Sequence, residues 1–241
     1  MSASEPADAV ENDTAENTAP MSPRRRATRE KLLDAAHQVF VDRGVVVSTI
    51  EEICEAAGFT RGAFYSNFTD KDDLVIALLE RETDQILSAL DRLQDDPNAS
   101  GPPEPAASDL AAPEADPTRG PAARILERFL SGRLIGRDHY LIHTELALAT
   151  ARQMSRSDAH EALAERQWER TTTSVRATLR AAGLEPIIDE ADFAGVLYAV
   201  LERSINQAIT TGSDDSDAFA RRVLPVVVDA LTRPASNRVN E

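Results

Sequence analysis

Apolar residues recur along most of the chain at the spacing of one helix face. Between Ser48 and Gly58 they fall at i, i+3, i+4 and i+7, which predicts an amphipathic helix. Ser48 and Thr49 can each cap its start, with a glutamate three residues later, so two registers of a capping box are open. Gly58 follows the last periodic residue and can end the helix in a left-handed conformation. The apolar positions are Ile50, Ile53, Cys54 and Ala57.

A second short helix is predicted directly after this one. Thr60 can cap a helix over Arg61–Phe68. Its apolar residues would face the core, which leaves four residues toward solvent: Arg61, Gly62, Tyr65 and Asn67. Two short helices joined by a glycine-containing turn describe a helix-turn-helix.

Helices are also predicted on both sides of this motif. One over Thr28–Asp42 would brace it, and no strand alternation persists anywhere. We therefore expect an all-α fold of about nine helices, with a three-helix head at 23–70 and a helical-bundle body at 71–235. The predicted body helices cover about 69–93, 125–134, 140–153, 157–183, 189–211 and 216–233, the last kinked or restarted at Pro225.

Three segments lack any apolar period. Residues 1–22 are acidic and contain proline, so we expect a disordered tail, with Met21 an alternative start that the sequence leaves open. Residues 95–120 are rich in proline, alanine and acids, and we expect a flexible insertion within the body. Residues 236–241 form a short tail.

The net charge of −15 is unusual for a protein that binds nucleic acid, but it is unevenly distributed. Eleven acidic residues and no lysine or arginine lie in 1–20 and 95–118, so only −4 remains for the rest. Residues 23–47 carry a net +3 that includes Arg24. Global acidity therefore leaves room for a local phosphate-binding surface, with Arg24 as a candidate contact or simply a solvated charge.

Several protein classes are disfavoured by the composition. One cysteine excludes an internal disulfide and fits a reducing cytoplasm. No apolar run has the length of a membrane span, and no signal peptide is visible. No nucleophile–base pair or glycine-rich phosphate loop stands out. We therefore expect a cytoplasmic protein that is not an enzyme and uses no cofactor.

The run AAGFTRGAFYSNFTDK, preceded by STIEEIC, resembles the DNA-binding signature of TetR-type (TetR/AcrR-like) transcriptional regulators. The match covers about sixty residues, and beyond roughly residue 85 it supports architecture only. The resemblance implies a homodimer that binds a double-stranded, palindromic DNA operator and is released by a small-molecule effector, with repression as the default. The specific positions are Gly58, Thr60, Arg61, Gly62, Tyr65, Phe68 and Lys71.

Within the motif, Arg61 is our candidate for base-edge contact, because arginine is the commonest reader of guanine and Arg61 starts the second helix. Gly62 would let the backbone approach the bases. The resemblance implies phosphate contacts for a further set, of which the two threonines can also act as caps: Thr49, Thr60, Tyr65, Asn67 and Lys71.

The resemblance also implies an effector pocket and a four-helix dimer interface in the body. The candidate pocket residues, each of which could instead be ordinary core, are Phe129, Arg133, Tyr140, His143, Trp168 and Phe193. The apolar stripes of the last two helices are wider than one core-facing side needs. Their candidate interface residues are Val196, Val200, Phe219, Val223 and Val227.

His139 and His143 are spaced so that a helix puts both imidazoles on one face. Such a pair could hold a metal, but the sequence identifies no third ligand. We favour pocket lining or packing as the role of these histidines and expect no metal site, but the sequence alone does not decide whether they bind a metal.

Two other functions fit the same helical pattern. A helical enzyme or small-molecule-binding protein would have only a superficial helix-turn-helix. An architectural DNA binder would have no effector.

Overall fold

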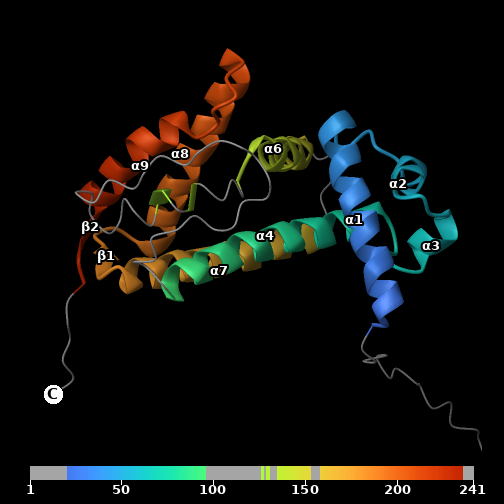
Figure 1. Cartoon of the computed structure of the whole chain (residues 1–241), viewed down its shortest axis with the longest axis horizontal. Coiled ribbons are helices and arrows are strands. Elements are labelled where there is room, and N and C mark those ends of the chain that lie inside the picture. The colour runs from blue at the N-terminus through green and yellow to red at the C-terminus, as the bar shows by residue number, and fades with distance from the viewer. Residues whose placement is uncertain (1–20, 96–125, 128, 131–134, 153–157, 236–241) are drawn as a thin grey trace, which may run out of the picture.

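The computed structural model describes residues 21–95, 126–127, 129–130, 135–152 and 158–235 (Figure 1). The residues for which we expected a disordered tail and a flexible insertion lie almost entirely outside these ranges. Arg133, most of the helix predicted over 125–134 and the tail 236–241 lie outside them too. Those expectations therefore remain predictions.

The head consists of α1 (Pro23–Arg43), α2 (Ile50–Ala57) and α3 (Arg61–Tyr65). The predicted start of α1 at Thr28 was wrong by five residues. Ser22 caps the helix by accepting a hydrogen bond from the Arg25 amide, and Pro23 occupies the first turn, where a proline ring already has helical φ. The basic segment at Arg24 is therefore part of a helix.

Local side-chain hydrogen bonds set the ends of the next two helices. Thr49 is the cap of α2 and forms a capping box with Glu52, which decides between the two possible registers. The predicted extension of α3 to Phe68 was wrong. The Ser66 hydroxyl and the Asn67 amide donate to the carbonyls of Gly62 and Ala63, which closes the helix after Tyr65.

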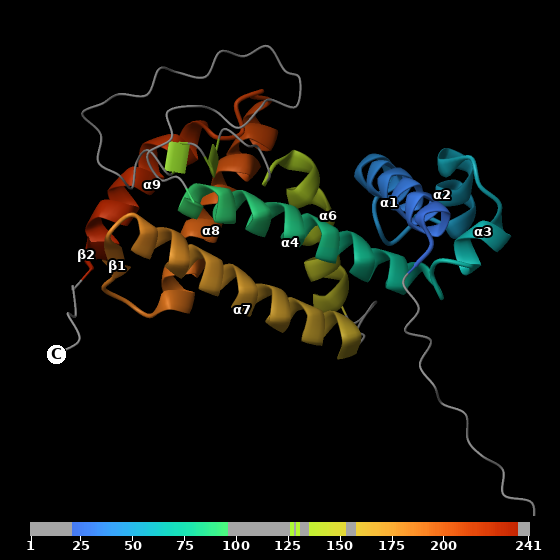
Figure 2. The same ribbon diagram turned by 60° about the horizontal axis from the view of Figure 1, so that its bottom comes forward.

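The body contains five helices in its described part: α4 (Lys71–Asp95), α6 (Arg137–Ala151), α7 (Asp158–Ala181), α8 (Glu190–Thr211) and α9 (Ala218–Leu231). α4 and α7 lie side by side as two long rods, and α8 packs on α9 (Figure 2). α9 continues through Pro225, so of the two expected outcomes, a kink or a restart, the restart does not occur. None of the described helices is long and apolar enough to span a membrane.

The described residues also contain one short two-stranded sheet within the all-α fold. β1 (Leu184–Pro186) pairs antiparallel with β2 (Thr232–Pro234), with Leu184 opposite Pro234. Strands of three residues are too short to show an alternating pattern in sequence. The all-α class itself is confirmed, because helices make up almost all of the described secondary structure.

One hydrophobic core runs from the head into the body. Phe40 and Phe64 of the head pack in the same cluster as Leu74 of α4, Ile142 of α6 and Leu163 of α7, and all five are almost fully buried. The division between head and body at residues 70 and 71 remains a prediction, and this core crosses it. A displacement of α4 or α6 would therefore shift side chains that pack directly against the head.

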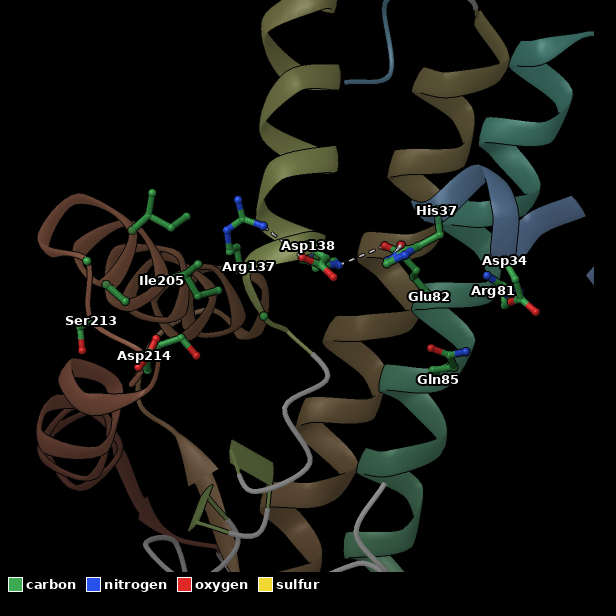
Figure 3. Close-up of a pocket in the computed structure, with 16 residues that line it drawn as sticks. Asp34, His37, Arg81, Glu82, Gln85, Arg137, Asp138, Ile205, Ser213 and Asp214 are labelled. Carbon is green, nitrogen blue, oxygen red and sulfur yellow. Dashed lines mark hydrogen bonds and ion pairs between the residues drawn. The ribbon is translucent and has the colours of Figure 1, made fainter. Parts of the chain in front are cut away.

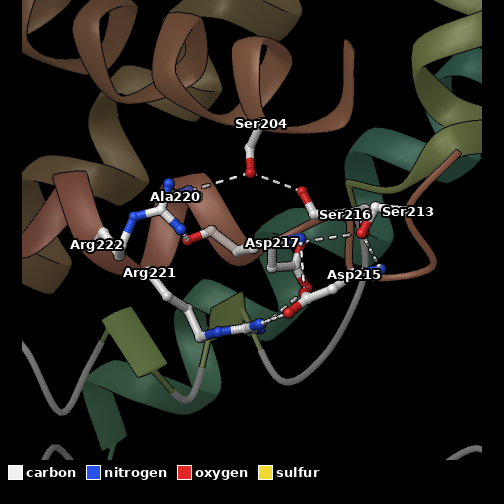
Figure 4. A network of polar contacts seen from close by, with 9 residues as sticks. Ser204, Ser213, Asp215, Ser216, Asp217, Ala220, Arg221 and Arg222 are labelled. Carbon is white, nitrogen blue, oxygen red and sulfur yellow. Dashed lines mark hydrogen bonds and ion pairs between the residues drawn. The ribbon is translucent and has the colours of Figure 1, made fainter. Parts of the chain in front are cut away.

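A buried serine organises the turn between α8 and α9 (Figure 4). Asp217, the residue before α9, makes no side-chain cap. Instead, the hydroxyl of Ser204 in α8 accepts a hydrogen bond from the Ala220 amide at 3.1 Å and donates to the Ser216 carbonyl at 2.6 Å. Arg221 pairs with Asp215 across the same turn. α8 thus caps α9, which fixes how the two helices pair.

We predict that Ser204→Ala lowers the free energy of unfolding by about 1–3 kcal/mol, because it leaves a buried donor and a buried acceptor unsatisfied. Ser88→Ala, at an exposed serine of α4, is the control and is expected to change it by less than about 0.5 kcal/mol. Urea titration of both variants decides the matter, and equal midpoints would contradict the capping role.

Candidate nucleic-acid interface

Arg61 lies at the exposed start of α3. Its guanidinium is 2.6 Å from a carboxylate oxygen of Glu51 and 3.3 Å from the hydroxyl of Tyr65. The hydrogen bond with Tyr65 and the nearby Glu51 both raise the pKa of Arg61, so the side chain is always positively charged. Thr60 caps the helix by accepting from the Ala63 amide at 3.3 Å. The result is a polar, solvent-facing surface at the N-terminus of the second helix of the motif.

Gly62 has open space around it. A methyl group added there would meet nothing in the described chain closer than the Thr60 hydroxyl at 3.7 Å, which is an ordinary contact. Glycine is also a poor helix former relative to alanine. Neither packing nor backbone conformation of the free protein therefore requires a glycine, which favours a requirement imposed by a binding partner.

Arg24, Thr49 and Tyr65 are accessible to solvent. Arg24 is exposed in the first turn of α1, and Tyr65 is 49 % exposed. Thr49 is exposed and caps the start of α2. These three, together with Thr60, Arg61 and Gly62, are the predicted DNA-contacting residues that the fold leaves accessible.

The expectation that Asn67 faces solvent was wrong. Asn67 is 9 % exposed, and its side-chain amide donates to the Ala63 carbonyl. Its own carbonyl accepts a hydrogen bond from Arg29 of α1 at 2.9 Å, and Arg29 also lies over the Phe68 ring. These contacts dock the end of the helix-turn-helix on α1, so Asn67 acts within the fold.

Lys71 has an unexpected role at the start of α4. Its ammonium donates to the carbonyls of Val45, Val46 and Ser48 at 3.0, 3.2 and 2.9 Å. A lysine has three N–H donors, and this arrangement uses all of them. Lys71 therefore holds the loop between α1 and α2, and it is not among the residues that we propose to contact phosphates.

Glu145 of α6, in the body, also forms hydrogen bonds with this loop. Its two carboxylate oxygens accept hydrogen bonds from the amides of Val45 and Val46 at 2.8 and 2.9 Å. Gly44 is needed at this place, because its φ is +99° and an added methyl group would lie 2.8 Å from the Glu145 carboxylate. Sequence reasoning missed Glu145, since no local pattern relates it to a loop 100 residues away.

Ion pairs add to the contact between head and body. Arg81 of α4 lies 2.7 Å from Asp34 and 3.3 Å from Glu30, both on α1. Next to it, the imidazole of His37 on α1 lies 3.8 Å from a carboxylate oxygen of Glu82. The head is thus connected to α4 along the middle of α1 and to both α4 and α6 at its loop.

A cavity of about 950 Å³ opens beside this junction (Figure 3). It lies between α1, α4, the start of α6 and the turn after α8. Polar and charged groups dominate its wall, with Ile205, Ala208 and Ile209 of α8 as the apolar part. None of the predicted effector-binding residues that the structure describes lines this cavity.

The predicted effector-binding residues are instead distributed over the body. Phe193 is 1 % exposed in the core, and Trp168 lies at the surface with its ring edge on Tyr198. The hydroxyl of Tyr140 accepts a hydrogen bond from Asn206. Phe129 is half-buried, and Arg133 lies outside the described residues.

His143, the remaining candidate, belongs to a cluster that sequence reasoning found only in part. His139 and His143 both approach Glu82, at 3.2 and 3.3 Å, and their rings stack with centroids 3.9 Å apart. Burial alone would raise the pKa of Glu82, but the hydrogen bonds from the two imidazoles outweigh it and lower the pKa to about 2. Burial lowers the pKa of His139 more strongly than Glu82 raises it.

The predicted dimer contacts lie on α8 and α9 and are half-buried in the single chain: Val196, Val200, Phe219, Val223 and Val227. Sequence reasoning missed Val226, which is 66 % exposed on α9. Val226 adds apolar surface beside the half-buried valines of α8 and α9.

We predict that Glu145→Ala increases the hydrogen-exchange rates of the Val45 and Val46 amides, because these groups lose their acceptor. The free energy of unfolding should fall by about 1–3 kcal/mol. Glu169→Ala, at an exposed glutamate of α7, is the control. Unchanged exchange at both amides would show that the loop does not depend on α6.

Comparison with known proteins finds a family likeness in the head. Residues 32–78 match the family model of bacterial regulatory proteins of the tetR family. The HTH-type transcriptional repressor BepR of Brucella suis is 52 % identical over 54 residues, which are 22 % of this chain and 26 % of BepR. The chain therefore spans about a quarter of the length of such curated relatives, and the likeness is confined to the head.

Solved structures extend the likeness to the body. A putative TetR-family transcriptional regulator from Rhodococcus sp. has a TM-score of 0.61 at 16 % identity and covers 86 % of this chain and 98 % of its own. A complex of SmeT with triclosan has a TM-score of 0.53 at 19 % identity and covers 87 % and 96 %. At these identities the likeness establishes the fold. Residues 32–78 therefore match the tetR-family model, and the chain has the fold of these solved structures.

Proposed function

We propose that this protein is a homodimeric transcriptional regulator that binds a palindromic DNA operator and is released by a small-molecule effector, acting as a repressor. The observation that carries the proposal is the exposed start of α3, where Arg61, Gly62 and Tyr65 face solvent on a helix-turn-helix of the TetR family. Such a role is not enzymatic, and it would place the protein in the cytoplasm with the DNA.

Arg61 is the residue that we propose reads a base edge. Its partner in the free protein is Glu51, and both side chains are more than half exposed. Exposed ion pairs contribute little stability, so giving up this pair on DNA costs little. The guanidinium is then available for bidentate hydrogen bonds to guanine in the major groove.

Phosphate contacts would orient the head around this base contact. Thr49 and Thr60 stand at the N-termini of α2 and α3, where free amides and the helix dipole favour an anion. Tyr65 and Arg24 extend the surface on either side. These groups position the protein without carrying sequence information.

Effector binding in the body would act on the head through α4 and α6. The cavity beside α1 is polar, and its wall includes Arg81 and Asp34, which also tie α4 to the head. A ligand that prefers one arrangement of these helices would shift the population of head positions. The SmeT complex supports a small molecule as the class of ligand for this fold, and the lining of the cavity favours a molecule with several hydrogen-bonding groups.

The dimer would form through α8 and α9. The half-buried valines of both helices, together with exposed Val226, supply an apolar surface that a second copy can cover. Symmetric pairing of the same surface on two chains is an isologous contact. Two heads about one helical turn of DNA apart would then read the two halves of a palindrome.

We predict opposite effects of Gly62→Ala on folding and on DNA binding. Stability should stay equal or rise by up to about 1 kcal/mol, because alanine is the better helix former and its methyl group meets no clash. Affinity for DNA from upstream of the protein's own gene should fall by about 1–3 kcal/mol, as for Arg61→Ala.

Fluorescence anisotropy at fixed salt measures the affinities, with Arg166→Ala on α7 as the control for loss of one exposed positive charge. If Gly62→Ala and Arg61→Ala bind DNA with the affinity and sequence preference of the wild type, α3 is not the reading helix.

We predict that Val226→Asp converts a dimer to a monomer, because the carboxylate would be buried without a partner at the interface. Val47→Asp is a matched control, since Val47 is 68 % exposed but lies on the head. Sedimentation at micromolar concentration gives the state of assembly. A wild-type monomer, or a Val226→Asp dimer as stable as the wild type, would exclude this interface.

A further inference from the structure

Three side chains from two helices converge on one point inside the body. Glu82 comes from α4, and His139 and His143 come from successive turns of α6. Nδ1 of His139 and Nε2 of His143 lie 3.2 and 3.3 Å from the same carboxylate oxygen of Glu82. One ligand atom from each of the three lies within 4.8 Å of the others.

We propose that Glu82, His139 and His143 bind a divalent transition-metal ion. Zinc is about 2.0–2.1 Å from imidazole nitrogen and about 2.0–2.2 Å from carboxylate oxygen, so ligands of one tetrahedral ion lie about 3.3–3.5 Å apart. The separations between Glu82 and the two histidines are already close to this value. Two histidines and one glutamate also form a known zinc ligand set that keeps an open position.

The charges of the three groups suit a cation. Glu82 brings a carboxylate to two imidazoles, and one of its oxygens lies 3.2 and 3.3 Å from their nitrogens. Two stacked imidazolium rings 3.9 Å apart would repel each other. Metal binding uses a carboxylate and neutral imidazoles, so it would remove this repulsion.

The surroundings of the site provide a further carboxylate oxygen and a route by which an ion can reach it. The second carboxylate oxygen of Glu82 is buried and accepts no hydrogen bond from the described residues. His37 of the head lies 3.8 Å from it, which makes His37 a candidate fourth ligand. Glu82, His37 and His139 also line the cavity, through which an ion can enter.

Tyr198 of α8 holds the orientation of one ligand. Its hydroxyl lies 3.5 Å from Nε2 of His139, on the side of the ring away from Glu82. A ligating histidine usually donates its other N–H to such a partner, which fixes the tautomer that ligates. This arrangement leaves Nδ1 of His139 for the ion.

The position of the site gives the ion a regulatory consequence. His143 lies two residues before Glu145, whose carboxylate holds the loop of the head. A metal between α4 and α6 would brace the segment of α6 that positions this loop. This consequence rests on the proposed function, whereas the binding of the ion does not.

The test is a titration of the full-length, untagged protein with Co²⁺, followed by visible absorption and by calorimetry. We expect one ion per chain. His143→Ala and Glu82→Gln should each weaken binding at least tenfold, because each removes a ligand. His160→Ala is the matched control, since His160 is the one histidine in the sequence outside the cluster and its vicinity, and it should leave binding unchanged.

Thermal unfolding with and without Zn²⁺ distinguishes loss of metal binding from loss of stability in a variant. Zn²⁺ should raise the melting temperature of the wild type and of His160→Ala, but not of His143→Ala or Glu82→Gln. Absence of Co²⁺ binding by the folded wild type, or equal binding by all four proteins, would overturn the site and leave the cluster as a hydrogen-bonded network.

A separate DNA-binding measurement with and without Zn²⁺ tests the regulatory consequence. A change in affinity that disappears in His143→Ala supports it, and a Zn²⁺-independent affinity rejects it while the site stands. If the wild type binds no DNA in either condition, the proposed function fails, and the titration still decides whether the metal site exists.

Discussion

The loop between α1 and α2 is the part of the molecule on which the position of the DNA-binding head depends. Its peptide groups have no helix or sheet partner, yet backbone polar groups near the interior must be satisfied. Two side chains from the body satisfy them. Lys71 donates hydrogen bonds to the carbonyls of Val45, Val46 and Ser48. Glu145 accepts hydrogen bonds from the amides of Val45 and Val46. Because Lys71 starts α4 and Glu145 lies on α6, both body helices set the geometry of the head. Charge-assisted hydrogen bonds of this kind are stronger than neutral ones, so they hold the loop firmly to these two helices.

The sequence predicts the starts of α2 and α3 and the end of α2 well, because each depends on a residue next to it. The capping residues Thr49 and Thr60 and the left-handed Gly58 lie within a few residues of the ends they determine, and all three have the expected conformation. The start of α1 was missed because the helix was predicted from its apolar positions, although Ser22 provides a cap. The roles of Lys71 and Glu145 could not be predicted, since their partners are at least 23 residues away.

The body shows the limits of reasoning from residue type. Aromatic side chains suggested a pocket, but large apolar groups are also the ones that fill an interior, and Phe193 does so. The cavity that exists is polar and lies where helices of head and body meet. The two histidines of α6 could be paired from their spacing alone. Their third partner, Glu82, lies 57 and 61 residues earlier in the chain, and only the tertiary fold brings it close.

The cavity, the histidine cluster and the loop contacts form one continuous path along α6. This helix begins at the wall of the cavity with Arg137, Asp138 and His139, reaches Glu82 through both histidines, and then holds the loop through Glu145. Ile142, on the same stretch, is fully buried in the core that includes the head. A close-packed core deforms little, so a shift at the start of α6 is passed on to the loop. A ligand can use this path only if it binds more tightly to one of two positions of α6, and its difference in affinity sets the largest possible effect on DNA binding. Under the proposed function, coupling between body and head would therefore require no contact between an effector and the helix-turn-helix.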